Sequence, residues 1–210
     1  MFEISKNLKV NIQILDNSKI FIIDNFYEYP DKIVDHILSF PSEYHKNFLP
    51  SYNGIHFEDR RHVIENFEIH NVYSFLEDIC CQKSKYPKNL IFTNYTKFGD
   101  NQFNDYENNY WWPHIDYGYT AIVYMNRGDC ISGTNLYLNI CPDLEPPNVP
   151  EHLEPWRPRE RFEVIKSLEP SYNRLVLFDA KKFVHGMNVC NSDYFGYTHR
   201  LNQVFFFQEP

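Results

Sequence analysis

Hydrophobic and polar residues follow different patterns in the two parts of this chain, and the N-terminal part carries the helical one. Residues 19–23 form an apolar run rich in β-branched side chains, which predicts a short strand. From Asp31 to Phe40 the apolar residues recur at the spacing of one helical face, and Pro41 ends the pattern. The same spacing returns at 71–83. The pattern therefore predicts one strand and two helices ahead of a β-rich remainder.

Short β-rich runs separated by turn residues fill the rest of the chain. A series of this kind is typical of a β-barrel or a β-sandwich. The predicted strands cover 90–98, 119–125, 134–140, 162–165, 174–178, 184–189 and 198–207.

A proline-rich, charged stretch at 142–161 interrupts the strand pattern. A loop of this length in a compact domain is usually functional or mobile. We expect either a lid over a substrate entrance or an ordered surface excursion packed against the N-terminal helices. Arg157, Arg159 and Arg161 alternate within the stretch and could recognise an acidic substrate, but a solvated loop face that balances nearby glutamates accounts for them better.

Length and composition favour one globular domain. The 210 residues are 43% hydrophobic and 18% aromatic, which is enough to bury a sizeable core and excludes intrinsic disorder. We expect a single domain over 1–210, in which residues 1–88 support a β-core formed by residues 89–210.

Charge and targeting signals narrow the possible partners and the compartment. Twenty basic against 28 acidic residues leave a net charge of −8, which disfavours binding to a phosphate backbone. The N-terminus has no basic and apolar signal pattern, and no apolar run approaches the length that crosses a bilayer. The five cysteines are odd in number and lack C-x-x-C spacing. We expect a cytoplasmic protein with reduced thiols and no membrane partner.

The residues that carry chemistry are two histidines and an aspartate. On an extended chain, His114 and Asp116 point to the same side and can bind one ion together, although an H-x-D pair alone is weak evidence. His185 lies on another predicted strand and is followed by Gly186, a glycine that permits close approach. Two imidazoles and one carboxylate form the facial triad that binds Fe(II) with open positions. Three such ligands could equally hold zinc with a bound water.

An arginine on the last predicted strand separates these two alternatives. Arg200, Asn202, Val204 and Phe206 share one strand face. An inward guanidinium in a β-barrel is costly unless an anion pairs with it. A dicarboxylate held by the guanidinium fork would satisfy it, which favours iron chemistry with an acidic co-substrate.

Taken in order, these residues resemble the 2-oxoglutarate- and Fe(II)-dependent oxygenases, in particular their prolyl-4-hydroxylase-like branch. The resemblance runs from residue 90 to residue 207. Two departures stand out: the interval of fifteen residues from His185 to Arg200 is longer than usual, and Arg200-Leu201-Asn202 replaces the usual R-x-S. The segments that carry the resemblance are 94–99, 114–116, 133–137, 174–178 with 185–186, Arg200, and 21–26 at the start of the chain.

The resemblance implies a mainly β (α+β) fold, a double-stranded β-helix or jelly-roll core with supporting N-terminal helices. It implies Fe(II) held by His114, Asp116 and His185, and 2-oxoglutarate as co-substrate bound by Arg200, with Tyr95 and Asn202 in the same pocket. With O₂, such a dioxygenase hydroxylates its substrate and releases succinate and CO₂. The substrate is unknown, with a protein side chain or a small molecule favoured over nucleic acid, and the oligomeric state is open.

Two other classes remain possible from the sequence. One is a jelly-roll binding module that retains a metal without turnover. The other is a zinc-dependent hydrolase, which needs a general base near a metal-bound water, and no glutamate adjoins the H-x-D pair.

Overall fold

The structure, a computed structural model, describes residues 1–39, 68–81, 107–127, 132–142, 156–189 and 200–207, and the backbone alone of 44–45, 58–63, 88–95 and 208. Strands dominate these residues, and only two α-helices occur among them. In chain order the elements are β1 (Lys9–Leu15), β2 (Ser18–Asp24), α1 (Pro30–Ser39), β3 (Tyr44–His45), β4 (Glu58–Val63), α2 (His70–Cys80), β5 (Lys88–Tyr95), β6 (Asn109–His114), β7 (Gly118–Tyr124), β8 (Thr134–Asn139), β9 (Trp156–Pro158), the 3₁₀ turn η5 (Arg159–Arg161), β10 (Phe162–Leu168), β11 (Arg174–Asp179), β12 (Val184–Met187) and β13 (Arg200–Gln208).

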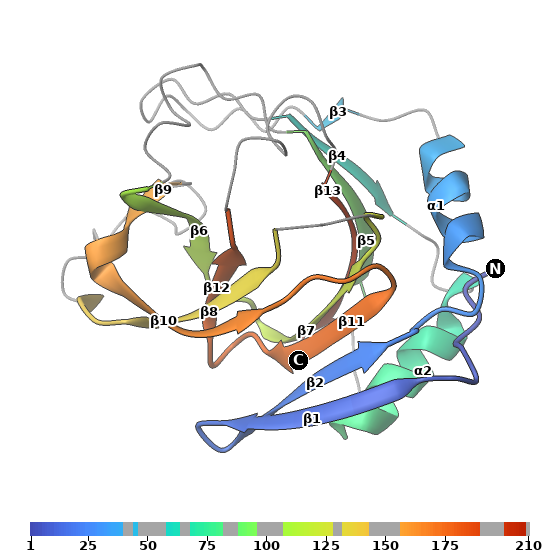
Figure 1. Cartoon of the computed structure of the whole chain (residues 1–210), viewed down its shortest axis with the longest axis horizontal. Helices are drawn as coiled ribbons and strands as arrows, with labels where there is room; N and C mark the ends of the chain where they lie inside the picture. The colour runs from blue at the N-terminus through green and yellow to red at the C-terminus, as the bar shows by residue number, and fades with distance from the viewer. Residues whose placement is uncertain are drawn as a thin grey trace.

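Two antiparallel sheets form the molecule (Figure 1). One has eight strands in the order β1-β2-β11-β7-β13-β5-β4-β3, and the other has five in the order β10-β8-β12-β6-β9. Successive strands from β6 to β8, and again from β10 to β13, belong alternately to the five-stranded and the eight-stranded sheet. This alternation is the topology of a jelly-roll, so the predicted fold class is confirmed.

The alternation of side chains along each strand produces two hydrophobic cores. One lies between the two sheets and includes Ile122, Leu136 and Val204. The other lies between the eight-stranded sheet and the two helices, where Phe205 of β13 packs against Tyr73 of α2. Val204 and Phe205 face opposite cores because successive residues of a strand point to opposite sides of its sheet. The N-terminal helices therefore cover the outer face of the eight-stranded sheet and leave its inner face to the interior of the jelly-roll.

The predicted helices match the observed ones to within a few residues. Helix α1 buries Ile33, Val34 and Ile37, the side predicted from their spacing. Helix α2 ends at Cys80, three residues before the predicted end, because Cys81 adopts a left-handed conformation with φ of 57° and donates its N–H to Glu77 O. No α-helix in the described part of the chain has the length and apolar character to span a bilayer.

Several strands were not predicted. Strand β1 pairs with β2 through a two-residue turn at Asp16 and Asn17, both with positive φ. Strand β4 pairs with β5, and β9 pairs with β6. Strand β9 begins at Trp156, so the end of the 142–161 stretch belongs to a sheet and not to a loop. That 1–210 forms a single domain stays a prediction.

Candidate metal centre

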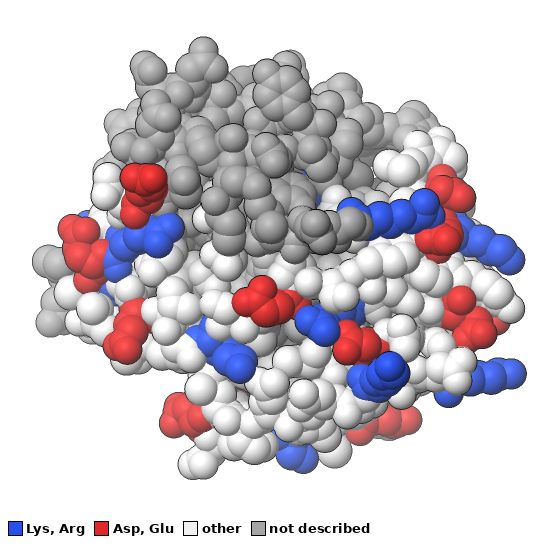
Figure 2. Space-filling model, viewed as in Figure 1, with Lys and Arg blue, Asp and Glu red and all other residues white. Residues whose placement is uncertain are grey.

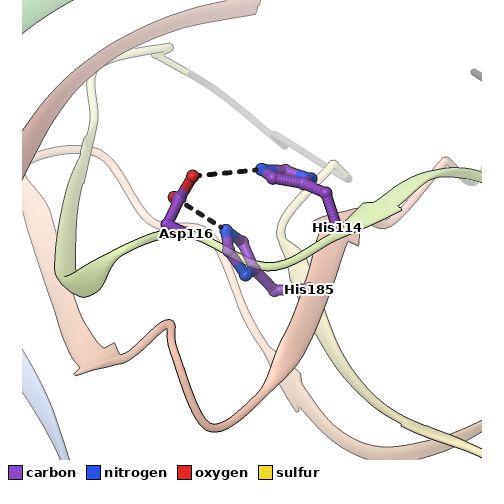
Figure 3. A group of neighbouring side chains, drawn as sticks. All are labelled: His114, Asp116 and His185. Carbon is purple, nitrogen blue, oxygen red and sulfur yellow. Dashed lines mark ion pairs between the residues drawn. The ribbon is translucent and has the colours of Figure 1, made fainter. Parts of the chain in front are cut away.

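Three side chains separated by up to 71 positions along the chain meet at one point (Figure 3). His114 is the last residue of β6, Asp116 lies two residues beyond it, and His185 belongs to β12. Nε2 of His185 lies 3.3 Å from Oδ2 of Asp116, and Nε2 of His114 lies 3.9 Å from Oδ1 of the same carboxylate. One donor atom from each residue fits within a span of 4.8 Å. The arrangement could bind a metal ion.

A β-bulge in β6 positions the first histidine. His185 lies opposite His114, but Met187 lies opposite Trp111, so β6 holds one more residue than β12 between these two pairs. Trp112, inside the bulge, has a φ of 50°. Bulges next to active sites turn a side chain away from its regular direction. Here the bulge places the His114 ring 4.3 Å from that of His185, centroid to centroid.

The close approach of β12 to β6 requires a glycine beside His185. A Cβ atom at Gly186 would lie 2.5 Å from the main-chain oxygen of Trp111 and 3.1 Å from that of Trp112. Contacts this short cannot persist, so one of the two strands would have to move. The sequence-based interpretation of Gly186 as a close-approach residue is confirmed.

We expect Gly186→Ala to lower the free energy of unfolding by about 1–3 kcal/mol, the usual cost of overpacking. Because the displaced strands carry His114 and His185, metal affinity should fall as well. Urea denaturation and titration with Co²⁺ would measure the two effects. An alanine variant with wild-type stability would mean that β6 and β12 can separate without strain.

The two histidines present the same ring nitrogen to the centre. Nδ1 of His114 donates to Trp112 O over 2.7 Å, and Nδ1 of His185 donates to Phe183 O over 3.2 Å. A carbonyl oxygen can only accept, so in each ring Nδ1 carries a proton, and Nε2 is the nitrogen that points toward Asp116. Such outer hydrogen bonds fix the tautomer and the orientation of metal-binding histidines.

The carboxylate of Asp116 is held in its ionised form. Burial opposes ionisation and is the largest single influence on its pKa. Four opposing influences together outweigh burial and lower the pKa to about 2. They are the hydrogen bond and the charge of His185, the charge of His114 and a hydrogen bond from Thr120. The Thr120 hydroxyl donates to Oδ2 over 3.0 Å, and the Asp116 N–H donates to Ala180 O over 3.1 Å. The centre therefore contains an oriented anion at neutral pH.

Arg157 corrects the expectation of a solvated loop face. Its side chain is 1% exposed, lies over the Phe162 ring at 4.7 Å, and donates from Nη1 to Pro113 O over 2.8 Å. Arg157 is buried because β9 pairs with β6, a contact between distant segments that the local sequence does not indicate. It stabilises the backbone directly before His114.

We expect Arg157→Met to lower the free energy of unfolding by about 1–3 kcal/mol, because the buried Pro113 carbonyl would lose a donor. Metal affinity should fall less than in variants of the three central residues. Arg127→Met is the matched control, since Arg127 forms an exposed pair with Asp31, and solvent screening leaves such a pair little effect on stability. Equal effects of the two substitutions in thermal denaturation would contradict the buried role of Arg157.

Trp156 also anchors the end of the 142–161 stretch near the centre. Its ring packs edge-on against that of Trp111, with 5.0 Å between centroids. Trp111 is itself buried, so it is the one of the two adjacent tryptophans that packs in the interior. Residues 143–155 lie outside the described residues, so the lid stays a prediction.

The remaining residues predicted for the site lie on and beside β13. Arg200 and Asn202 are buried, at 6% and 4% exposure, on the same strand face as Val204, which packs between the sheets. Nε and Nη2 of Arg200 donate to the carbonyl oxygens of Ser132 and Gly133, each over 3.2 Å. The Tyr95 side chain lies outside the described residues. The backbone of Asn94, just before it, pairs with Arg200.

Two buried polar atoms near Arg200 lack hydrogen-bond partners within the described part of the chain. They are Oδ1 of Asn202 and Oγ of Ser132, the residue whose carbonyl accepts from Arg200. A buried polar atom without a partner is costly and typically marks a site for a water or a ligand. A buried cation and two unpaired oxygens therefore lie in one part of the interior.

Sequence reasoning identified the three central residues and missed those that orient them. Thr120 lies four residues after Asp116 and Arg157 lies 44 positions after Pro113. Neither has a motif that indicates this role. The main-chain carbonyls of Trp112 and Phe183 carry no sequence signal at all.

Comparisons with known proteins leave the family open. No family model matches the chain, and no curated protein matches it either. Among solved structures, one that matches is a prolyl-4-hydroxylase of Pseudomonas putida, with 11% sequence identity, a TM-score of 0.39, and coverage of 86% of this chain and 100% of that one. Similarity at this level identifies neither the family nor the activity.

Proposed function

We propose that this protein is an Fe(II)- and 2-oxoglutarate-dependent dioxygenase that hydroxylates its substrate with release of succinate and CO₂. The observation that carries the proposal is the cluster of His114, Asp116 and His185, which offers two imidazole nitrogens and one carboxylate within 4.8 Å. Two histidines and one carboxylate are the ligand set of non-haem Fe(II) oxygenases.

The residues present fit an iron ion. Both Nε2 atoms point toward the Asp116 carboxylate because both Nδ1 atoms donate to main-chain carbonyls, so one ion could bind the two imidazoles and the carboxylate together. The Thr120 hydroxyl donates to that carboxylate and limits its rotation. Iron bound here would supply the activation of O₂, coupled to oxidation of 2-oxoglutarate. The protein contributes ligand orientation, an ionised carboxylate and a partly enclosed site.

The interior around Arg200 suits the second carboxylate of 2-oxoglutarate. Arg200 is buried and bears a permanent positive charge, and it donates to the carbonyl oxygens of Ser132 and Gly133. A carboxylate would pair with the guanidinium through charge-assisted hydrogen bonds. The unpaired oxygen atoms of Asn202 and Ser132 could accept from a water that accompanies the co-substrate. The Tyr95 hydroxyl is proposed for the same pocket from the sequence alone.

The substrate class is proposed from charge. On the face shown in Figure 2, acidic and basic side chains are interspersed and do not gather by sign. The absence of a basic patch among the described residues on this face and the net charge of −8 favour a protein side chain or a small molecule over nucleic acid as the substrate.

The test is an anaerobic titration of the metal-free protein with Fe(II), then with 2-oxoglutarate, followed by a substrate screen that measures succinate release in air. We expect one iron per chain, 2-oxoglutarate binding that requires the metal, and slow succinate release even without substrate. Binding of both without succinate release would indicate a metal-retaining binding module. Preference for Zn²⁺ together with no effect of 2-oxoglutarate would indicate a hydrolase.

A further inference from the structure

Strand β1 forms one edge of the eight-stranded sheet and has a free side. It pairs with β2 over seven residues, and no other strand among those described pairs with it. In Figure 1 the β1–β2 hairpin runs along the lower side of the molecule. An edge strand presents unpaired N–H and C=O groups to any strand that can reach it.

This edge carries exposed aliphatic side chains. Val10, Ile12 and Ile14 alternate along β1 and are 50%, 51% and 66% exposed. Monomeric proteins usually protect an edge with a charged side chain, a proline or a bulge in mid-strand. From Val10 to Leu15, β1 has none of these, since its polar residues are the uncharged Asn11 and Gln13 and its pairing with β2 is regular.

The hairpin geometry determines which main-chain groups point outward. In a two-residue hairpin, the residues that flank the turn exchange both hydrogen bonds, and bonded pairs then alternate along the ladder. Leu15 and Ser18 flank the turn, so Leu15, Gln13, Asn11 and Lys9 bond to β2. The N–H and C=O groups of Val10, Ile12 and Ile14 therefore point to the free edge. The same three residues present both the aliphatic side chains and the unpaired backbone.

We propose that β1 pairs antiparallel with β1 of a second copy of this chain, about a two-fold axis at Ile12. In this register Ile12 lies opposite Ile12 of the other copy, Val10 opposite Ile14, Asn11 opposite Gln13, and Lys9 opposite Leu15. All seven residues are paired, and each outward-pointing backbone group meets another. The two eight-stranded sheets join into one continuous sheet of sixteen strands.

The self-complementary sequence of β1 is what selects a second copy as the occupant. On each side of Ile12, β1 has first an uncharged polar residue, Asn11 or Gln13, and then an aliphatic one, Val10 or Ile14. Aliphatic side chains of one copy therefore meet aliphatic side chains of the other on the same face. About the two-fold axis the Ile12 contact occurs once and the contact between Val10 and Ile14 occurs twice.

The interface is small, so the dimer is expected to be weak. A seven-residue strand pair buries less than the roughly 800 Å² per partner of a standard stable interface. We expect a reversible dimer at high protein concentration and a monomer on dilution.

Sedimentation velocity over a wide range of concentrations tests the proposal. The wild-type protein should show a monomer–dimer equilibrium with no larger species. Ile12→Lys places two ammonium groups opposite each other at the axis and should raise the dissociation constant about tenfold or more, equivalent to about 1.4 kcal/mol. The matched control is Leu138→Lys on β8, because Leu138 is 52% exposed and lies on the other sheet. Circular dichroism would establish that both variants are folded.

Amide hydrogen exchange by NMR tests the register. Raising the concentration should slow exchange at the amides of Val10, Ile12 and Ile14 and leave Asn11 and Gln13, already bonded to β2, nearly unchanged. A monomer at every concentration would overturn the proposal. So would a dimer that Ile12→Lys does not weaken, protection confined to other residues, or growth into larger assemblies.

Discussion

Alanine in place of His114, Asp116 or His185 is expected to abolish metal-dependent turnover and to reduce metal affinity by more than any other substitution considered for this protein. The three residues supply all the protein ligands of the proposed centre, and an open facial site has no spare ligand. The loss of affinity should exceed the roughly 10- to 100-fold that removal of an outer hydrogen bond causes. Titration of each folded variant with Fe(II) under anaerobic conditions, and with Co²⁺ in air, would measure it.

Thr120→Val is the matched control for the Asp116 variant. Valine has nearly the same shape as threonine but cannot donate to Oδ2 of Asp116, so the carboxylate remains and only its orientation is weakened. We expect a loss in metal affinity of roughly 10- to 100-fold. A triad variant that retains wild-type turnover would remove that residue from the metal centre.

Arg200→Met is expected to weaken 2-oxoglutarate binding roughly tenfold to a hundredfold, which corresponds to about 1.5–3 kcal/mol for a hydrogen bond to a charged group. Methionine fills a similar volume and removes the charge. Iron affinity should stay close to wild type, because the guanidinium is assigned to the co-substrate and not to the metal. Calorimetric titration of the iron-loaded protein with 2-oxoglutarate, in the absence of O₂, would separate the two affinities.

The control for this variant is Arg174→Met. Arg174 binds Asp24 through Nε at 2.6 Å on the partly exposed side of the eight-stranded sheet, so its loss should leave 2-oxoglutarate affinity unchanged. Equal 2-oxoglutarate affinity in the Arg200 variant and the wild type would place the anion site elsewhere. A simultaneous loss of iron and 2-oxoglutarate affinity would indicate a structural role for Arg200.

The elements with strong local patterns were predictable. Helices α1 and α2 follow from apolar residues repeated on one helical face, and both bury that face against the eight-stranded sheet. Strands β2, β7, β8, β11 and β13 follow from dense runs of β-branched and aromatic residues. The missed strand β9 spans only three residues, begins with a tryptophan and ends with a proline. It is a strand because β6 pairs with it.

For the candidate site, the sequence by itself determined the identities of the chemical groups: two histidines, one aspartate and an inward arginine. Only the tertiary structure decided how these groups are arranged. The bulge at Trp112, the fit of Gly186 against the Trp111 carbonyl and the burial of Arg157 all depend on pairing of β6 with β12 and β9. Strand pairing joins segments far apart in the chain through main-chain groups that every residue has, so the local sequence carries no signal for it.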